Sequence, residues 1–250
     1  MCYITVISFE RTNNMKIPTP VVDYSKLKIN NINSLEYRHL KKLLYWPVFG
    51  LLFWYAENLY PVAEYYVMYH PVDSMIPFNE LFVLPYLFWF IYLIGIHLYT
   101  LLYDIDAFDK LMDFIIITNT AGLVIFFLFP TCQMLRPAVM PRDNILTQFM
   151  THFYAFDTNT NVCPSLHVVG SAAVSYAAWN AKGLNSKFCR GIFSVITILI
   201  SVSTVFLKQH SVIDVVVAIV VCLTAVCVCS VIRYNSGEKQ YSHRKLMAYK

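Results

Sequence analysis

The sequence has few charged residues: they fill only 14% of its 250 positions, whereas hydrophobic residues fill 58%. Its mean hydropathy of +0.53 is too high for an ordinary soluble domain. Its seven cysteines include no Cys-x-x-Cys pair, which argues against a zinc site. The sequence also lacks repeats, a Gly-rich nucleotide loop and a basic surface for nucleic acid. These absences indicate an integral membrane protein with no nucleic-acid partner.

Apolar stretches of nearly 20 residues recur along the chain, and each could cross about 30 Å of hydrocarbon. The predicted fold class is all-α, a polytopic membrane protein with a core of six transmembrane helices in one domain, residues 43–234. A polar N-terminal segment, residues 1–42, and a basic tail, residues 235–250, flank this domain. The predicted spans are 43–61, 81–103, 112–130, 166–183, 190–207 and 212–233.

The basic residues predict the orientation. If six spans place both termini on one side, that side holds 16 of the 19 lysines and arginines, and the other keeps only Arg136, Arg142 and Lys208. By the positive-inside tendency, both termini are then cytoplasmic. We expect the protein in the cell membrane, with the lipid bilayer as its surroundings. The sequence does not indicate an oligomeric state.

Two segments, 163–167 and 208–214, place histidine and aspartate at the ends of apolar helices, where such residues are costly and usually functional. His210 precedes Asp214 by four residues, so the carboxylate can orient the imidazole on one helical face. His167 could supply or remove protons. By the predicted orientation, both histidines and Arg136 lie on the extracytoplasmic face. They could therefore form one site.

The same segments contain groups suited to phosphate. Pro164 is typical of the first position of a helix, and the three backbone N–H groups after it would then be free to bind an anion. A serine hydroxyl adds a donor, an arginine can clamp two oxygens, and a lysine can add a point charge. The predicted phosphate ligands are Arg136, Ser165, Leu166 and Lys208.

At these positions the chain resembles the type 2 phosphatidic acid phosphatase superfamily, which includes lipid phosphatases, vanadium haloperoxidases and inositol phosphorylceramide synthases. The resemblance implies a phosphohistidine intermediate on His210, which Asp214 orients, with His167 as acid and then base. It implies that Arg136 and Ser165 hold phosphate, and that neither a metal nor another cofactor takes part. The matching segments are Arg136-Pro137, Pro164-Ser165-Leu166-His167 and Ser203…His210…Asp214.

The Pro-Ser-Leu-His form is similar to the branch of the inositol phosphorylceramide synthases. Two positions depart from the superfamily pattern, since Phe129 replaces a lysine and Thr204 replaces an arginine. Two expected phosphate-binding cations are therefore missing. Lys208 and Arg142 are possible replacements, because a dianionic phosphate needs compensating charge.

The long loop 131–165 calls for a purpose. Asp143 could cap a short amphipathic helix that covers the site and guides a lipid into it, although an ordinary interfacial helix would show the same pattern. The apolar face of this helix would carry Ile145, Leu146, Phe149, Met150 and Phe153. A disulfide between Cys132 and Cys163 is conceivable in this loop.

An acidic cluster lies on the predicted cytoplasmic turn, across the bilayer from the histidines. A solvated loop with a capped helix start explains the cluster better than a metal site does. The cluster consists of Asp104, Asp106, Asp109 and Asp113.

The predicted function is that of a membrane-embedded phosphohydrolase, which cleaves a lipid phosphate or pyrophosphate at the extracytoplasmic surface. The closest alternative is a phospho-headgroup transferase of the inositol phosphorylceramide synthase type, which would use the same residues. A non-catalytic membrane relative, transporter or scaffold is an alternative of another class. A metal-dependent phosphotransferase is disfavoured, because no carboxylates cluster on the histidine side.

Overall fold

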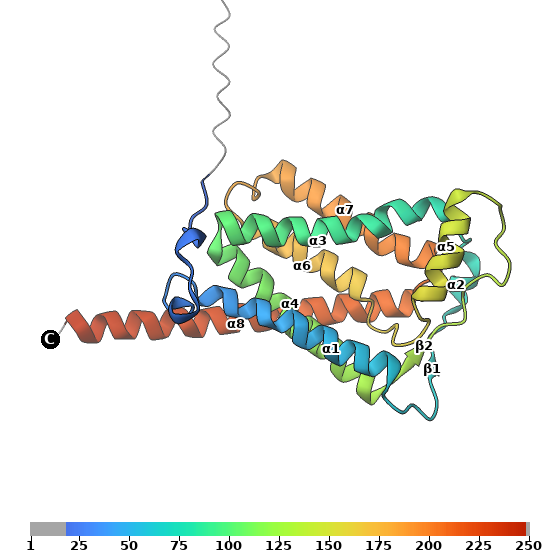
Figure 1. Ribbon diagram of the computed structural model, residues 1–250, viewed down its shortest axis with the longest axis horizontal. Helices are drawn as coiled ribbons and strands as arrows, with labels where there is room; N and C mark the ends of the chain where they lie inside the picture. Colours follow the sequence, from blue (N-terminus) through green and yellow to red (C-terminus); the bar gives the residue numbers. More distant parts are fainter. Residues whose placement is uncertain (1–18, 249–250) are drawn as a thin grey trace, which may run out of the picture.

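The computed structural model describes residues 19–248, which form eight α-helices and two short strands (Figure 1). The first 18 residues of the predicted N-terminal segment and the last two of the tail lie outside the described residues. The strands β1 (Tyr66–Val67) and β2 (Thr131–Cys132) pair in parallel. The helices are α1 (Tyr45–Asn58), α2 (Pro71–Met75), α3 (Val83–Tyr103), α4 (Ile105–Leu128), α5 (Ile145–Phe156), α6 (Leu166–Asn180), α7 (Lys187–Phe206) and α8 (Val212–Ala248).

Within the described part of the chain, four helical segments are long and apolar enough to cross a membrane. The predicted first and fourth spans are also helical, but α1 has 14 residues and α6 has 15. At 1.5 Å per residue they measure about 22 Å, which is short of the ~30 Å hydrocarbon core. The structure therefore supports four spans, and the count of six stays a prediction. The four segments are Glu80–Tyr103, Ile105–Leu128, Lys187–Phe206 and Val212–Tyr234.

The outer surface of these helices is apolar. Large aliphatic side chains stay exposed along α3, α7 and α8, among them Ile91, Ile198 and Leu223, which are 67%, 60% and 62% exposed. Such a continuous apolar exterior is unfavourable in water but matches hydrocarbon. The exterior therefore fits a lipid bilayer.

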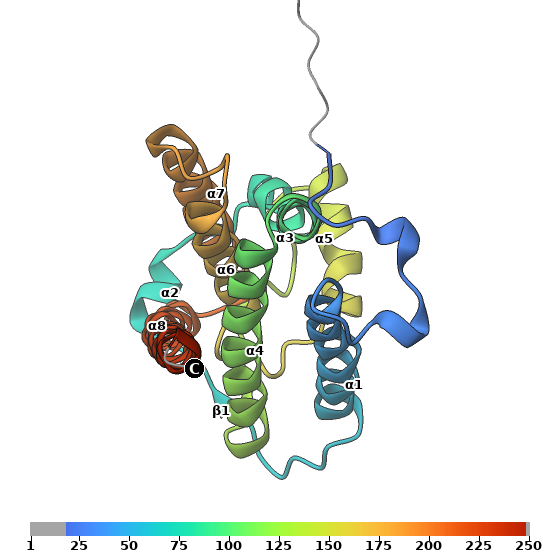
Figure 2. The same ribbon diagram turned by 90° about the vertical axis from the view of Figure 1, so that its left-hand side faces the viewer.

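The central helix is α6, which packs against α3, α4, α7 and α8. Its small residues Ser171, Ala173 and Ala177 have no exposed surface, and small side chains let neighbouring helices approach closely. α6 is therefore the central helix of the bundle, and the last two helices, α7 and α8, pack against it. Figure 2 shows α1 on the outer side of α4, away from α8.

The two ends of the bundle differ. At one end α5 lies across the helices, and α2, β1 and β2 lie at the same end, whereas both ends of the described chain lie at the other (Figure 1). The acidic cluster belongs to this other end. There Asp104 accepts the Ala107 N–H and caps α4, while Lys42 pairs with Asp109 at 2.9 Å and with Asp113 at 2.6 Å. The predicted capping role is confirmed.

The predicted amphipathic helix of the long loop is α5, but the prediction that Asp143 caps it is wrong by one residue. The cap is Asn144, whose side chain accepts the N–H groups of Leu146 and Thr147 at 3.0 Å each. Asp143 instead accepts a hydrogen bond from Gln148. Asn and Asp cap equally well, so the choice between adjacent candidates depends on tertiary contacts.

Only part of the predicted apolar face of α5 is buried. Met150 is fully buried, and Leu146 and Phe153 pack beside it against the start of α3. Ile145 and Phe149 remain 80% and 41% exposed. The helix therefore anchors to the bundle through one row of side chains and presents a second apolar row outward.

Candidate active site

The four-residue spacing between His210 and Asp214 produces a direct contact. Asp214 lies in the first turn of α8, whereas His210 lies in the short connection from α7, so the prediction that both occupy one helical face is wrong. His210 Nδ1 is 3.4 Å from Asp214 Oδ2, which is longer than an ordinary hydrogen bond. The Asp214 carboxylate is fully buried and also accepts the Ser211 N–H at 2.9 Å. The pair can thus orient the imidazole, since catalytic hydrogen bonds are often long before substrate binds.

Aromatic side chains of α3 hold His167, the second residue of α6. Its ring stacks on Tyr86 with 4.1 Å between centroids, and Trp89 lies at 4.5 Å. The His167 ring is 6.3 Å from the ring of His210. Its Nε2 is buried and has no hydrogen-bond partner. The imidazole is therefore fixed by packing, while one of its nitrogens remains available for proton transfer.

Gly170 gives Trp89 the space to lie beside His167. A Cβ atom at Gly170 would come within 2.8 Å of the indole, whereas a Cβ at Gly95 meets nothing within 4 Å. We therefore expect Gly170→Ala to displace Trp89, cost about 1–3 kcal/mol of stability and lower turnover about tenfold or more. Gly95→Ala is the matched control and should change neither. Thermal unfolding and turnover in detergent measure both effects, and an equal response of the two variants would contradict this role of Gly170.

Both histidines line one cavity of about 90 Å³. Asp157 and Gln209 also reach it, and Leu166 and Phe53 make part of its wall apolar. No lysine or arginine of the described chain lines this cavity. Its lining residues are Phe53, Tyr86, Asp157, Thr158, Thr160, Asn161, Val162, Pro164, Leu166, His167, Gln209 and His210.

Arg136 lies next to the cavity but its guanidinium binds protein oxygens. One terminal nitrogen donates to the carbonyls of Tyr154 and Asp157 at 3.0 and 2.8 Å. The other donates to the Thr158 carbonyl at 2.8 Å and to Gln209 Oε1 at 2.6 Å. Arg136 therefore fixes the segment after α5 and the residue before His210. Its predicted role as a phosphate clamp would require some of these bonds to be exchanged.

The N-terminus of α6 starts later than predicted. The helix begins at Leu166 with Ser165 as its cap, so the prediction that Pro164 takes the first helical position is wrong by two residues. The Ser165 N–H donates to the Asp214 carbonyl at 3.3 Å, which ties α6 to the start of α8. The Ser165 hydroxyl is buried without a partner. The N–H groups of Leu166 and His167, in the first turn, have no acceptor within the helix.

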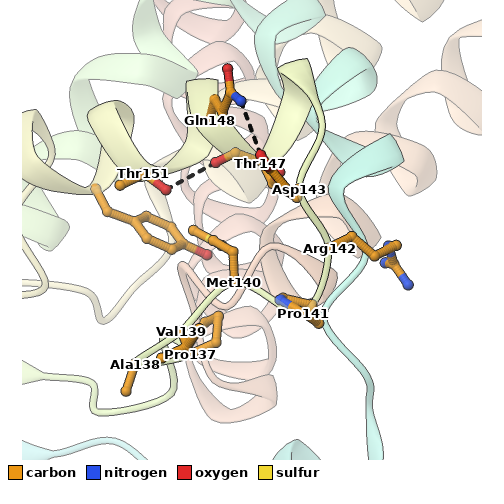
Figure 3. A pocket seen from close by; sticks show the side chains of 11 residues that line it. Pro137, Ala138, Val139, Met140, Pro141, Arg142, Asp143, Thr147, Gln148 and Thr151 are labelled. Atoms are coloured by element: carbon orange, nitrogen blue, oxygen red, sulfur yellow. Dashed lines mark hydrogen bonds between the residues drawn. The ribbon is translucent and has the colours of Figure 1, made fainter.

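Neither proposed replacement cation lies in the histidine cavity. The Lys208 ammonium donates to the carbonyls of Asp73, at 2.7 Å, and Ile76, and Lys208 lines a different cavity of about 560 Å³. Arg142 binds the Glu80 carboxylate through two nitrogens. Figure 3 shows Arg142 at a third cavity, between the loop 137–143 and α5, with its side chain directed away from the centre.

The two positions that depart from the superfamily pattern contribute no charge. Phe129 is the C-cap of α4, is 56% exposed and contacts Tyr66. Thr204 is buried, its hydroxyl bonds the Ser201 carbonyl, and its own carbonyl accepts the N–H of His210 at 3.2 Å. Thr204 therefore supports the histidine through its backbone.

Asp73 of α2 holds the segment that carries His210, and sequence reasoning missed it. Its buried carboxylate accepts the Ser211 hydroxyl at 2.6 Å and the Val212 N–H at 2.9 Å, and so caps α8. Its carbonyl accepts the Lys208 ammonium. Asp73 and Ser211 are 138 residues apart, so no local pattern indicates the contact.

Asp73→Ala should destabilise the protein by about 3 kcal/mol, because it leaves a buried hydroxyl and a helix N–H without their charged acceptor. Ser74→Ala is the control, since Ser74 is the next residue of α2 and is exposed. That change should stay within about 0.5 kcal/mol. Thermal unfolding in detergent distinguishes the two, and a stable Asp73→Ala variant would mean that α8 needs no such cap.

Sequence reasoning also missed Tyr86, Asp157 and Gln209, which line the cavity, and Trp89, which packs on His167. The one available signal was adjacency, because Gln209 immediately precedes His210. The aromatic pair comes from α3, whose apolar pattern does not distinguish lipid-facing rings from rings that hold a histidine.

Cys132 and Cys163 are buried free thiols, so the conceivable disulfide is absent. Burial, and then the neighbouring Asp214 carboxylate, raise the pKa of the Cys163 thiol to about 12. Cys163 is therefore an unreactive thiol beside the His–Asp pair.

A buried His–Asp pair, a second histidine and a small cavity thus lie together at one end of an apolar helical bundle of membrane type. The PAP2 superfamily model matches residues 110–238, just over half of the chain, from within α4 to α8. The chain therefore belongs to the PAP2 superfamily. A search of curated proteins and a search of solved structures found no match.

Proposed function

We propose that the protein is a membrane-embedded phosphohydrolase that cleaves the phosphate ester or pyrophosphate of a lipid through a phosphohistidine on His210. The observation that carries this proposal is the convergence of His210 and His167 on one small cavity, with Asp214 buried behind His210. Superfamily membership supports a phosphatase-type activity. The Pro-Ser-Leu-His segment supports a relation to the branch of the inositol phosphorylceramide synthases.

In the proposed mechanism, His210 Nε2 attacks phosphorus while Asp214 holds Nδ1. A bond forms between that nitrogen and phosphorus, the bond from phosphorus to the leaving oxygen breaks, and His167 gives its proton to that oxygen. Water then resolves the phosphohistidine as His167 takes the proton back. The stacking of His167 on Tyr86 supports this role, because it fixes the proton carrier 6.3 Å from the nucleophile, ring to ring.

Phosphate would be held mainly by neutral donors. The candidates are the partnerless Ser165 hydroxyl and the N–H groups of Leu166 and His167 at the N-terminus of α6, where the helix dipole favours an anion. Arg136 would contribute charge from behind Gln209, to which it donates at 2.6 Å. Lys208 would act from farther away, since its ammonium rests on carbonyls of the α2 region.

In the membrane, we propose a six-helix domain over residues 43–234, with cytoplasmic termini and the histidine cavity on the extracytoplasmic face of the cell membrane. Basic residues at the end opposite α5, such as Lys42, Lys110 and Arg233, support this orientation. α1 and α6 would complete the six despite their length, with local thinning of the bilayer around them. The exposed apolar row of α5 would lie at the surface.

A phospho-headgroup transferase is the second candidate. It is favoured by the cavity lining, in which the described residues supply no lysine or arginine for a dianionic phosphate. In that reaction an alcohol instead of water would resolve the phosphohistidine. The nucleophile, the acid and the orienting carboxylate would be the same.

The experiment is an assay of the purified protein in detergent with a panel of lipid phosphates, pyrophosphates and phosphodiesters, in the presence of a chelator. We expect release of free phosphate or headgroup and inhibition by vanadate. Transfer of a headgroup to an added lipid alcohol, without free phosphate, would favour the transferase. A requirement for added divalent metal would overturn the mechanism, and no turnover on any member of the panel would favour a non-catalytic relative.

A further inference from the structure

The charge of the histidine cavity is unusual for a phosphate site. Apart from the two histidines, the ionisable groups among its described lining residues are the phenol of Tyr86 and the carboxyl of Asp157. The nearest arginine, Arg136, lies behind Gln209 and uses its terminal nitrogens on protein oxygens. A ligand in the cavity would therefore contact the Asp157 carboxylate directly, whereas the Arg136 guanidinium is separated from it by Gln209.

Asp157 is fixed at the edge of this cavity. It is the C-cap of α5, its backbone carbonyl accepts an Arg136 N–H at 2.8 Å, and its Oδ2 accepts the Gln209 side-chain N–H at 3.1 Å. Gln209 thus bridges the carboxylate to the arginine. The positive charge of Arg136 is thus already compensated by the negative charge of Asp157. It can offset little of the charge of a ligand.

The charged surroundings of Asp157 lead to the same conclusion. Burial raises the pKa of the Asp157 carboxyl, and the nearby Arg136 and His210 offset this only in part, while Glu57 adds to it. A dianion placed beside this group would raise the pKa further. Dianion binding would thus be opposed by repulsion or require the uptake of a proton.

We propose that Asp157 determines the charge specificity of the site: it favours a phosphate with a single negative charge, as in a phosphodiester, over a dianionic phosphomonoester. This rests on the proposed function, in which the cavity takes the phosphate of a lipid, and it narrows the substrate class to lipid phosphodiesters. A diester keeps one ionised oxygen, whereas a monoester carries a charge of about −1.5 to −2 at pH 7. The neutral donors at the start of α6 suit the smaller charge.

The reaction balances for a diester. His210 Nε2 forms a bond to phosphorus, one ester bond from phosphorus to oxygen breaks, and the proton of His167 passes to the departing alkoxide. The other ester stays on the phosphohistidine, so the intermediate carries one charge rather than two. Water or an alcohol then takes the place of His210 on phosphorus.

The test compares two soluble probes that differ by one methyl group and one charge, dimethyl phosphate and methyl phosphate. Their binding to the full-length protein in detergent at pH 7.5 is measured from the rise in unfolding temperature with probe concentration. We expect dimethyl phosphate to bind the wild type at least tenfold more tightly. Asp157→Asn removes the charge at nearly constant volume and should abolish or invert this preference, whereas Asp157→Glu should keep it.

The matched control is Asp143→Asn. Asp143 is an exposed carboxylate near the other end of α5, where it accepts a hydrogen bond from Gln148. This variant should keep the wild-type preference. The same unfolding curves report whether each variant is folded. If Asp157→Asn does not fold, Asp157→Ser replaces it as the variant without the charge.

Equal binding of the two probes to the wild type, no binding of either, or a preference that survives in Asp157→Asn would overturn the proposal. The proposed function fails differently, through the absence of turnover on every lipid of the panel. A protein that hydrolyses phosphatidic acid readily and binds methyl phosphate at least as tightly as the diester would keep its proposed function and lose this specificity.

Discussion

His210→Ala is expected to abolish turnover, with a loss of about 10⁴-fold or more. The imidazole is the proposed nucleophile, it lines the cavity, and it is the ring that contacts the buried Asp214 carboxylate. Alanine leaves no group that could form the covalent bond to phosphorus. The protein should still fold, because His210 lies in a connection whose position is fixed by Asp73, Thr204 and the backbone of α8.

His152→Ala is the control for this prediction. His152 is an exposed histidine of α5 that bonds the Gln148 carbonyl and lies outside the cavity. Its removal should leave turnover unchanged. If the His210→Ala variant kept the wild-type rate on the lipid that the wild type cleaves, the phosphohistidine mechanism would be wrong.

The second large effect is expected for Asp214→Asn, a loss of about 10²- to 10⁴-fold in turnover. A neutral amide can present its N–H to His210 Nδ1, which would force the wrong tautomer onto the nucleophile, and it cannot stabilise positive charge on the ring. The amide oxygen can still accept the Ser211 N–H that Asp214 accepts at 2.9 Å. The start of α8 should therefore persist, and substrate binding should change little.

This pattern separates a positioning carboxylate from a merely structural one. An orienting role predicts a fall in kcat with KM and unfolding temperature nearly unchanged, measured on the same lipid. Asp109→Asn is the control, because Asp109 also pairs with a cationic side chain but lies at the opposite end of the bundle. A parallel loss of stability and activity in Asp214→Asn, with kcat restored at low temperature, would assign Asp214 to folding alone.

The sequence predicted those parts of the fold and site that depend on local pattern. The membrane-type helices follow from apolar runs. The spacing of four residues indicated the His210–Asp214 contact, although His210 lies in the connection before α8 and not on the helix itself. The α5 helix follows from its amphipathic period, although its cap was misplaced by one residue. The superfamily assignment followed from motif order and is confirmed over residues 110–238.

The parts that the sequence could not predict depend on distant contacts. Nothing near Asp73 in the chain indicates that it caps α8, and nothing near Arg136 indicates that carbonyls after α5 occupy its nitrogens. Lys208 was assigned to phosphate from its type and position, whereas its ammonium binds the α2 region. Charge can be counted from a sequence, but its partners are decided by packing.

The length of the helices is a further limit. Hydropathy windows gave spans of 18 or 19 residues for the first and fourth segments, whereas α1 and α6 have 14 and 15. In α6 the whole difference arises at the C-terminal end, since the helix starts at Leu166, where the predicted span starts, but stops at Asn180, before Gly183 in a positive-φ turn. Apolar residues that flank a helix raise the window average without extending the helix.

Trapping the covalent intermediate would show directly whether His210 is the nucleophile. The wild type is mixed with a lipid radiolabelled at phosphorus, quenched in denaturant after a few milliseconds to seconds, and digested to locate the label. We expect label on the peptide that contains His210, stable in base and lost in acid, and none in His210→Ala. Turnover without any protein-bound label in the wild type, or label on another residue, would contradict this expectation.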